Sequence, residues 1–237
     1  MDELQYRQMY IEEDRHWWFL AKRAFVRTML STLPTNLKIL DIGSGTGGMS
    51  AYLSGRGTLL AIEKSPYAIP YLRKRNITYQ HRSVQLSSFK PNTFDLICAF
   101  DVLYHKEMGN DRRVVRKMYQ WLKPGGTVCV TDCAVPLLFS HHDRVMHAAK
   151  RYWLSELTAI LKKEGFIITK ASYIYFFTFP LFVLSRMIDA VHPYNTMKPL
   201  PRALNSILIT LCFMESYLLR YVNFPIGSSV LIVAKKP

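Results

Sequence analysis

The sequence predicts an α/β fold whose centre is a seven-stranded, mostly parallel sheet with helices on both faces. Three observations lead to this prediction. Short apolar runs of strand type alternate with helical patterns along the chain, an order typical of parallel sheets. The 237 residues, of which 49% are hydrophobic and 20% charged, suffice for one packed core. Two helical stretches, one before the first strand and one before the last, fall outside this alternation.

Seven runs rich in branched and aliphatic residues are predicted to be strands. They occupy residues 37–42, 58–63, 77–81, 94–100, 127–132, 166–173 and 228–234. Helical patterns between them cover residues 47–56, 66–75, 111–122 and 153–164. We expect the third of these helices to end at Lys123-Pro124-Gly125-Gly126, because Pro and Gly stop a helix and turn the chain into the next strand.

A single domain over residues 1–237 is predicted from this order. We expect an N-terminal helical cap at 1–34, a core at 35–179, a helical insertion at 180–222 and the last strand at 223–237. A loop-rich, Pro-bearing stretch lies inside the insertion, at residues 192–201. Segments added outside a sheet commonly carry binding sites, so the cap and the insertion are where we expect an acceptor substrate to bind.

The chain is strongly basic, with 31 Lys and Arg against 17 Asp and Glu and a formal net charge of +14. A positive field of this size attracts nucleic acid, anionic lipid or an anionic substrate. A basic surface that meets only solvent is an equally open interpretation. The charge by itself does not decide between these partners.

Cysteine usage and apolar runs favour a cytoplasmic protein. The four cysteines, at positions 98, 129, 133 and 212, form no CxxC pair and show no metal-ligand spacing, so we expect free thiols and no metal site. The N-terminal residues are charged and lack the apolar core of a signal peptide. The apolar stretches 173–184 and 203–214 are shorter than the roughly 20 residues of a membrane-spanning helix. Peripheral contact with the inner face of a membrane stays open.

The first predicted strand runs into a glycine-rich loop, Asp41-Ile42-Gly43-Ser44-Gly45-Thr46-Gly47-Gly48. Glycines suit a tight turn whose backbone closely approaches a ligand. Gly43, Gly45 and Gly48 also match the GxGxxG pattern of dinucleotide-binding enzymes, so the loop alone leaves the ligand open. Glu63 ends the second strand, where a carboxylate can accept hydrogen bonds from both ribose hydroxyls of an adenosyl group.

Four segments in order resemble the motifs of the class I S-adenosylmethionine (SAM) dependent methyltransferases, which have a Rossmann-like core. They are residues 40–47, Phe94-Asp95-Leu96-Ile97, Val102-Leu103-Tyr104-His105 and Leu122-Lys123-Pro124-Gly125-Gly126. The resemblance implies SAM as the cofactor. A bacterial group of methyltransferases related to the ubiquinone-biosynthesis type is more closely similar. That similarity is carried by His16-Trp17-Trp18-Phe19, Lys22-Arg23, His142-Asp143 and Arg151-Tyr152. Members of this group often accompany glycan or lipid assembly, which implies a small or lipid-linked acceptor.

The resemblance also implies which residues bind the cofactor. The loop backbone would cradle the methionine part of SAM, with Asp41 ordering the loop and Glu63 binding the ribose. Trp18 would act as a lid, with Lys22 or Arg23 meeting the SAM carboxylate, although such aromatic residues equally often pack on a sheet. The implied set is Trp18, Arg23, Asp41, Gly43, Ser44, Gly45, Gly47, Glu63, Lys64, Ser83, Val84 and Phe100. Ser83 stands where relatives usually carry an Asp that meets the adenine amino group, which implies weaker SAM binding.

His105, directly after the fourth predicted strand, is the predicted catalytic residue. Transfer to a hydroxyl benefits from a proton acceptor whose pKa lies near the working pH, and histidine has such a pKa without perturbation. A histidine that only packs this loop is the alternative. His141, His142 and Asp143 form a second candidate, in which the carboxylate would orient an imidazole.

We therefore expect a methyltransferase that acts on a hydrophobic small molecule or a lipid-linked glycan, at oxygen or nitrogen. The insertion favours this because it holds more apolar residues than one packed helix hides. Its basic residues, Arg186, Lys198, Arg202 and Arg220, would guide an anionic head group. The alternatives are an RNA or protein methyltransferase and a non-catalytic protein that keeps the fold. A nucleic-acid partner is not expected, because no RNA-binding module and no Asn/Asp-Pro-Pro-Tyr motif is visible.

Overall fold

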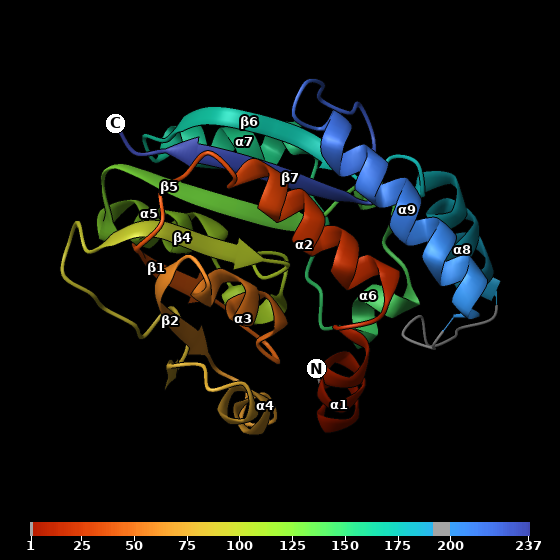
Figure 1. Cartoon of the computed structure of the whole chain (residues 1–237), viewed down its shortest axis with the longest axis horizontal. Coiled ribbons are helices and arrows are strands. Elements are labelled where there is room, and N and C mark those ends of the chain that lie inside the picture. Colours follow the sequence, from red (N-terminus) through yellow and green to blue (C-terminus); the bar gives the residue numbers. More distant parts are fainter. Residues whose placement is uncertain (1, 192–199) are drawn as a thin grey trace.

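A computed structural model describes residues 2–191 and 200–237 and contains the predicted seven-stranded sheet. The strand order is β3-β2-β1-β4-β5-β7-β6, and β7 alone runs antiparallel to its neighbours (Figure 1). The strands are β1 (Leu37–Ile42), β2 (Gly57–Glu63), β3 (Tyr79–His81), β4 (Phe94–Phe100), β5 (Leu122–Cys133), β6 (Ile167–Ile174) and β7 (Ser229–Lys235). This confirms the predicted fold class.

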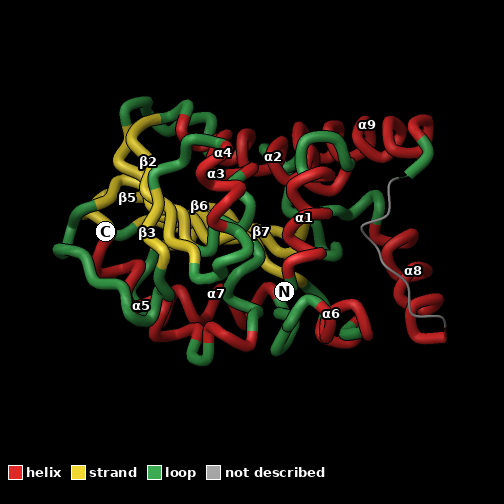
Figure 2. Tube along the Cα trace, turned by 90° about the horizontal axis from the view of Figure 1, so that it is seen from below, coloured by secondary structure: helices red, strands yellow, loops and turns green. Residues whose placement is uncertain are grey.

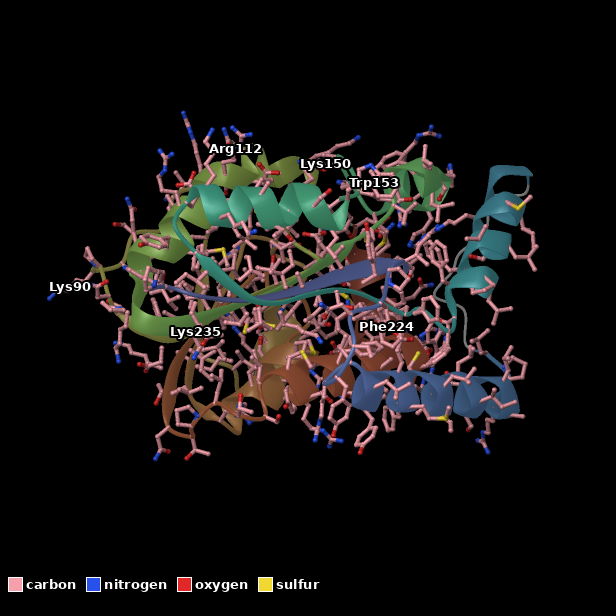
Figure 3. All side chains as sticks on the ribbon, turned by 90° about the horizontal axis from the view of Figure 1, so that it is seen from above. Lys90, Arg112, Lys150, Trp153, Phe224 and Lys235 are labelled. Atoms are coloured by element: carbon pink, nitrogen blue, oxygen red, sulfur yellow. The ribbon has the colours of Figure 1, made fainter. Side chains whose placement is uncertain are left out.

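Helices cover both faces of the sheet, with α5 and α7 on one face and α2, α3 and α9 on the other (Figure 3). The bounds are α1 (Glu3–Glu12), α2 (Trp17–Met29), α3 (Gly48–Ser54), α4 (Ile69–Lys74), α5 (Asp111–Trp121), α6 (His141–Val145), α7 (Leu154–Lys163), α8 (Phe179–Val191) and α9 (Arg202–Leu218). Short 3-10 turns lie at Lys106–Met108 and Pro136–Leu138.

The alternation of side chains along the strands divides the core in two. Ile39 belongs to the same apolar cluster as Phe25 of α2, whereas its neighbour Leu40 belongs to the cluster that contains Val115 of α5. All four side chains are fully buried. Because successive residues of a strand point to opposite faces, a strand that is apolar at every position needs cover on both sides. The sequence pattern therefore specified the layers as well as the strands.

The third helix ends one residue before its predicted end, but the fifth strand begins five residues earlier than predicted. Lys123-Pro124-Gly125-Gly126 belongs to β5, which begins at Leu122, directly after α5. Leu122 pairs with Phe94, and the register then shifts before Leu96 meets Thr127. Gly125 has a φ of +76° and donates a backbone hydrogen bond to Lys236. Pro and Gly end the helix as expected, but their backbone bends the strand locally while pairing continues on both sides.

The two additions to the sheet are helical, as predicted. The N-terminal stretch, expected as one segment, divides into α1 and α2 around residues 13–16. The insertion forms α8 and α9, which extend beyond the end of the sheet toward which β4 points (Figures 1 and 2). Most of the Pro-bearing stretch at 192–201, with Lys198, lies outside the described residues.

The cysteines are free thiols, and Cys98 and Cys129 are register partners on β4 and β5. Within residues 2–191 and 200–237, no helix combines the length and the apolar character needed to cross a bilayer.

Candidate functional site

A cavity of about 540 Å³ lies at the carboxyl ends of β1, β2, β4 and β5. Its walls come from the glycine-rich loop, from α1 and α2, from the segment after β4 and from the insertion helices. The chain connections diverge between β1 and β4, the place where open α/β sheets leave a crevice for ligands. All thirteen predicted site residues except Gly47 are in the cavity wall.

The glycine-rich loop turns beneath this cavity. Gly43, Gly45 and Gly47 have φ angles of +69°, +57° and +86°, a region that side chains rarely tolerate. A Cβ on Gly43 would lie 2.6 Å from Cγ2 of Val102, so glycine is required there for packing as well. The hydroxyl of Ser44 is buried and has no hydrogen-bond partner among the described residues. An unpartnered polar atom at a cavity wall fits a polar ligand that completes its hydrogen bonding.

Asp41 orders this loop from below. Its carboxylate is 2% exposed and accepts a hydrogen bond of 2.5 Å from the hydroxyl of Ser50 on α3. Burial, with a smaller contribution from the negative charge of Glu63, raises the pKa of Asp41 to about 7. The carboxylate therefore ties the end of β1 to the start of α3.

Glu63 lies at the end of β2 and faces the loop. Its carboxylate accepts backbone hydrogen bonds from Gly45 at 2.8 Å and from Ser65 at 2.7 Å. Burial raises its pKa, while the hydrogen bonds from Ser65, Gly45 and Lys64 lower it. Two fixed donors hold the carboxylate oxygens in place and leave further lone pairs directed at a ligand.

The remaining predicted cofactor residues differ in their exposure. Ser83 is half-buried and Val84 buried, both in the cavity wall opposite the loop. Phe100 is half-buried at the end of β4. Lys64 is exposed at the cavity rim and pairs with Glu107 at 3.2 Å.

The aromatic residues of α2 line the cavity from the side of the cap. The indole of Trp18 stacks on Tyr175, with centroids 4.2 Å apart and rings parallel within 1°. The Tyr175 hydroxyl donates a hydrogen bond to the backbone oxygen of Trp18. Trp18 is therefore fixed in the cavity wall, where it packs against Tyr175 and also faces the cavity. Arg23 also reaches the cavity, and it bonds to the backbone oxygen of Glu13 and the carboxylate of Asp14.

Sequence reasoning missed Glu13. It is 4% exposed and accepts hydrogen bonds from the hydroxyl of Thr46 at 2.8 Å and from the backbone of Gly48 at 3.1 Å. Arg75 donates to its other oxygen at 2.6 Å. The cap is thus attached to the glycine-rich loop through one carboxylate. No local pattern could have indicated this, because the partners lie 33 and 35 positions apart.

His105 lies in the cavity wall, but its ionisation differs from the expectation. Burial lowers its pKa to about 4 and outweighs the nearby negative charge of Glu107, which raises it. The imidazole is therefore neutral at physiological pH. It can accept a hydrogen bond, but it has little driving force as a proton acceptor.

The second histidine candidate forms a different arrangement from the one expected. Asp143 on α6 is 2% exposed and binds Arg151, with Nε to Oδ1 at 3.0 Å, and the backbone of Ser140 at 2.9 Å. Its carboxylate is thus committed to a buried ion pair. His142 lies in the cavity wall, whereas His141 is exposed. In residues 2–191 and 200–237 no three His, Cys, Asp or Glu side chains form a group that could hold a metal ion.

Asp101 is a second residue that the sequence analysis missed. It follows β4 directly, has a φ of +54° and lines the cavity. Its carboxylate forms an ion pair with Lys22 of α2. The signal that could have found it is its position, one residue past the end of a predicted central strand.

The insertion completes the cavity on the side away from the loop. Two guanidinium groups approach the ring of Phe182 on α8, with Arg186 at 4.6 Å and Arg151 at 5.2 Å from its centroid. Apolar side chains form most of this wall. They include Leu181 and Phe182 of α8, Leu200, and Leu204 and Leu208 of α9.

Comparison with known proteins agrees with this geometry. Residues 40–130 match the family model described as a methyltransferase domain. Phosphoethanolamine N-methyltransferase of Plasmodium falciparum is 33% identical over 110 residues, which are 43% of this chain and 41% of that protein. The mitochondrial ubiquinone biosynthesis O-methyltransferase of Schizosaccharomyces pombe is 32% identical over 111 residues, 43% of this chain and 39% of that one. The chain thus spans less than half the length of these relatives.

Solved structures share the whole fold. The methyltransferase in a complex with the Haloferax volcanii Trm112 methyltransferase activator has a TM-score of 0.63 at 19% identity, covering 99% of this chain and 94% of that one. Phosphoethanolamine N-methyltransferase 2 of Haemonchus contortus, solved with SAM, has a TM-score of 0.60 at 20% identity, covering 91% and 52%. At these identities the similarity concerns the fold.

Proposed function

We propose that this chain, a class I SAM-dependent methyltransferase by its domain and its fold, transfers the methyl group to oxygen or nitrogen of a hydrophobic small-molecule or lipid-linked acceptor. One observation carries the proposal. The glycine-rich loop and the apolar wall of the insertion helices enclose the same cavity. A SAM molecule against the loop and an apolar acceptor against the helices could therefore lie side by side. Methyl transfer is a displacement at the methyl carbon, and its main requirement is that the two reactants are held in line.

The residues around the loop fit SAM. The unpartnered hydroxyl of Ser44 and the carboxylate of Glu63 face the place where a methionine chain and a ribose would lie. In this proposal Ser83, Val84 and Phe100 line the adenosyl and methionine parts, with Trp18 and Arg23 closing the cap side. When bound, SAM supplies a methyl group on a positively charged sulfur. The chain binds it, orients it and excludes water.

We assign to His105 the role of orienting the acceptor. As a neutral imidazole it can accept a hydrogen bond from a hydroxyl or an amine in the cavity. Its low pKa makes it a poor final proton acceptor, so proton removal would rely on water or another group. In this proposal His105 lies beside the reacting atoms and orients the acceptor, and it does not remove the acceptor's proton.

The acceptor class is inferred from the outer surface of the insertion. Several large apolar side chains of α8 and α9 are exposed. They are Leu181, Leu184, Met187 and Ile188 on α8, and Leu204, Ile207, Phe213, Met214, Tyr217 and Leu218 on α9. Leu181 and Leu204 belong to this surface and to the cavity wall at once, so the cavity opens onto it. A continuous apolar path of this kind suits an acceptor with a hydrocarbon chain.

Peripheral contact with an anionic membrane completes the proposal. The exposed apolar side chains of α8 and α9 lie beside Arg202 and Arg220, on a chain with a net charge of +14. Buried apolar area and attraction to anionic lipid together drive such binding. Sedimentation with vesicles of phosphatidylcholine, with and without phosphatidylserine, tests it. Binding that requires phosphatidylserine and weakens as salt rises is expected, and equal binding to both vesicles contradicts it.

The test of the acceptor wall uses two positions of one helix. Leu204→Arg places a charge at the cavity mouth and should lower methyl transfer to a lipid extract at least about tenfold, because an apolar ligand that contacts this wall would remove water from the charge. SAM affinity, measured by calorimetry, should stay within a factor of about three. Ser206→Arg changes an exposed polar residue of α9 outside both the cavity wall and the apolar surface, and it should leave methyl transfer and SAM affinity unchanged. Absence of SAM binding in the unmodified chain would refute the proposed function itself.

A further inference from the structure

The ion pair of Lys22 and Asp101 joins the cap to the centre of the sheet. Lys22 comes from α2 and Asp101 from the end of β4, 79 positions later. The Lys22 side chain is 6% exposed and that of Asp101 19% exposed, and both residues line the cavity. A carboxylate and an ammonium are costly to remove from water, so a pair at this depth calls for an explanation beyond surface solvation.

Asp101 is held in a fixed and unfavourable backbone conformation. Its φ of +54° lies in the left-handed region. The Asp101 backbone donates to the oxygen of Thr131 at 2.8 Å, and the Thr131 hydroxyl donates to Oδ1 of Asp101 at 3.3 Å. Strained residues persist where the surroundings fix them, and they gather at functional sites. The carboxylate is therefore presented at the cavity wall next to Phe100.

The partner of Asp101 shows what this carboxylate binds. Lys22 brings a primary alkylammonium to it, with the Lys22 nitrogen 5.2 Å from the ring centre of Trp18. An amine-bearing acceptor that enters along the insertion wall would meet the same carboxylate and the same indole face. Aromatic faces and carboxylates are the groups that recognise ammonium ions.

We propose that Asp101 is the carboxylate that binds the acceptor, and that the acceptor's nucleophile is the nitrogen of an amine carried by an apolar chain. This deepens the proposed function and rests on it. The bound ammonium first loses a proton to solvent. In the transfer the lone pair of the resulting neutral amine forms the new nitrogen–carbon bond as the carbon–sulfur bond breaks, and the electron pair of the broken bond stays on sulfur. The positive charge moves from sulfur to nitrogen, and a proton then leaves the methylated nitrogen to solvent.

The position of Asp101 favours that movement of charge. A fixed carboxylate beside the nitrogen stabilises the charge that develops there, and a site of low polarity strengthens the effect. Lys22 acts as a positioning residue, which holds the carboxylate in the absence of an acceptor and competes with an incoming ammonium. It faces Asp101 after β4, Asp132 and Cys133 on β5 and the Trp18 ring on its own helix.

Octylamine and octan-1-ol serve as matched probes for calorimetry in the presence of S-adenosylhomocysteine, because they differ only in the polar group. The unmodified chain should bind octylamine about tenfold or more tightly than octanol. Asp101→Asn should abolish this preference and leave octanol binding within a factor of about three. Asparagine tolerates the left-handed backbone, so the fold should persist. Asp95→Asn is the control, since Asp95 pairs with Lys123 at the opposite end of β4, outside the cavity.

A second variant keeps the proposal testable if Asp101→Asn fails to fold. Lys22→Met removes the competing ammonium and should tighten octylamine binding at pH 7 by about threefold or more, with octanol unchanged. Equal affinity of the unmodified chain for both probes, or an amine preference that survives Asp101→Asn, overturns the inference. Measuring SAM binding in the same proteins distinguishes a failure of this inference from a failure of the proposed function. If SAM binds but Asp101 gives no preference for octylamine, this inference alone is refuted. If SAM does not bind, the proposed function is refuted.

Discussion

Glu63 accepts a hydrogen bond of 2.8 Å from the backbone nitrogen of Gly45, so the end of β2 holds the middle of the glycine-rich loop. The two residues lie 18 positions apart and face one cavity. A loop that is fixed before its ligand arrives loses less entropy when the ligand binds. The following predictions test this preorganised site and the cap that closes it.

Glu63→Ala should weaken SAM binding by about 1.5–3 kcal/mol, because a hydrogen bond to a charged group is lost and the loop loses its anchor. The dissociation constant measured by calorimetry should rise roughly 10- to 150-fold. Glu156→Ala, which removes an exposed carboxylate of α7, is the control and should leave SAM binding unchanged. An unaltered dissociation constant in Glu63→Ala would remove this residue from the site.

Gly45→Val should abolish SAM binding while the chain stays folded. The nearest atom to a Cβ at this position is Cε of Met9 at 3.3 Å, so the new side chain would occupy cavity space. Gly109→Val supplies a matched control, because its φ of +58° equals the +57° of Gly45 within a degree and nothing lies within 4 Å of its Cβ. Both variants place a branched side chain at a positive φ. Equal SAM affinity in the two would mean that the loop does not approach the cofactor.

His105→Ala should lower turnover by about 10²-fold, the scale expected when a reactant loses its alignment, with SAM affinity unchanged. The pH profile between 6 and 9 should keep its shape, because the pKa of His105 near 4 leaves the imidazole neutral throughout. His141→Ala, at an exposed position, should have no effect. An inflection near pH 6.5 that disappears in His105→Ala would show an imidazole that titrates during turnover.

The same pKa predicts a stability effect without any substrate. The unfolded chain binds the His105 proton with a pKa near 6.5 and the folded chain with a pKa near 4. The free energy of unfolding should therefore fall as the pH drops from 6.5 to 4. Urea denaturation of His105→Ala should show a smaller fall over this interval than the unmodified chain.

Glu13→Gln should loosen the cap and lower the free energy of unfolding by about 1–2 kcal/mol, because hydrogen bonds to a charged carboxylate are weakened. SAM release, measured by stopped flow, should become faster, since α1 and α2 would detach more often from the loop. Glu164→Gln weakens a comparable pair with Arg116 away from the cavity. It should reduce stability without changing SAM release, and an equal effect of both variants on release would contradict the attachment of the cap.

Local sequence determined the sheet, its two layers and the cofactor half of the site. The strand at 37–42, the glycines after it and the carboxylate ending the next strand are near one another in the chain, so strand period and turn chemistry predicted where they meet. The predicted residues of this local unit that reach the cavity are Asp41, Gly43, Ser44, Gly45, Glu63 and Lys64. Gly47 is buried behind the loop, where a Cβ would meet Leu72 at 2.8 Å. Its glycine serves packing and a positive φ.

Tertiary structure alone decided how the cap and the insertion complete the site. Glu13 reaches the loop, Lys22 reaches Asp101, and Asn205 of α9 binds the backbone of Trp17 at 2.9 Å across 188 positions. Burial likewise set the ionisation of His105, which its residue type could not predict. Contacts between distant segments and the loss of water around a group arise only when the chain is folded, because both depend on which surfaces pack together.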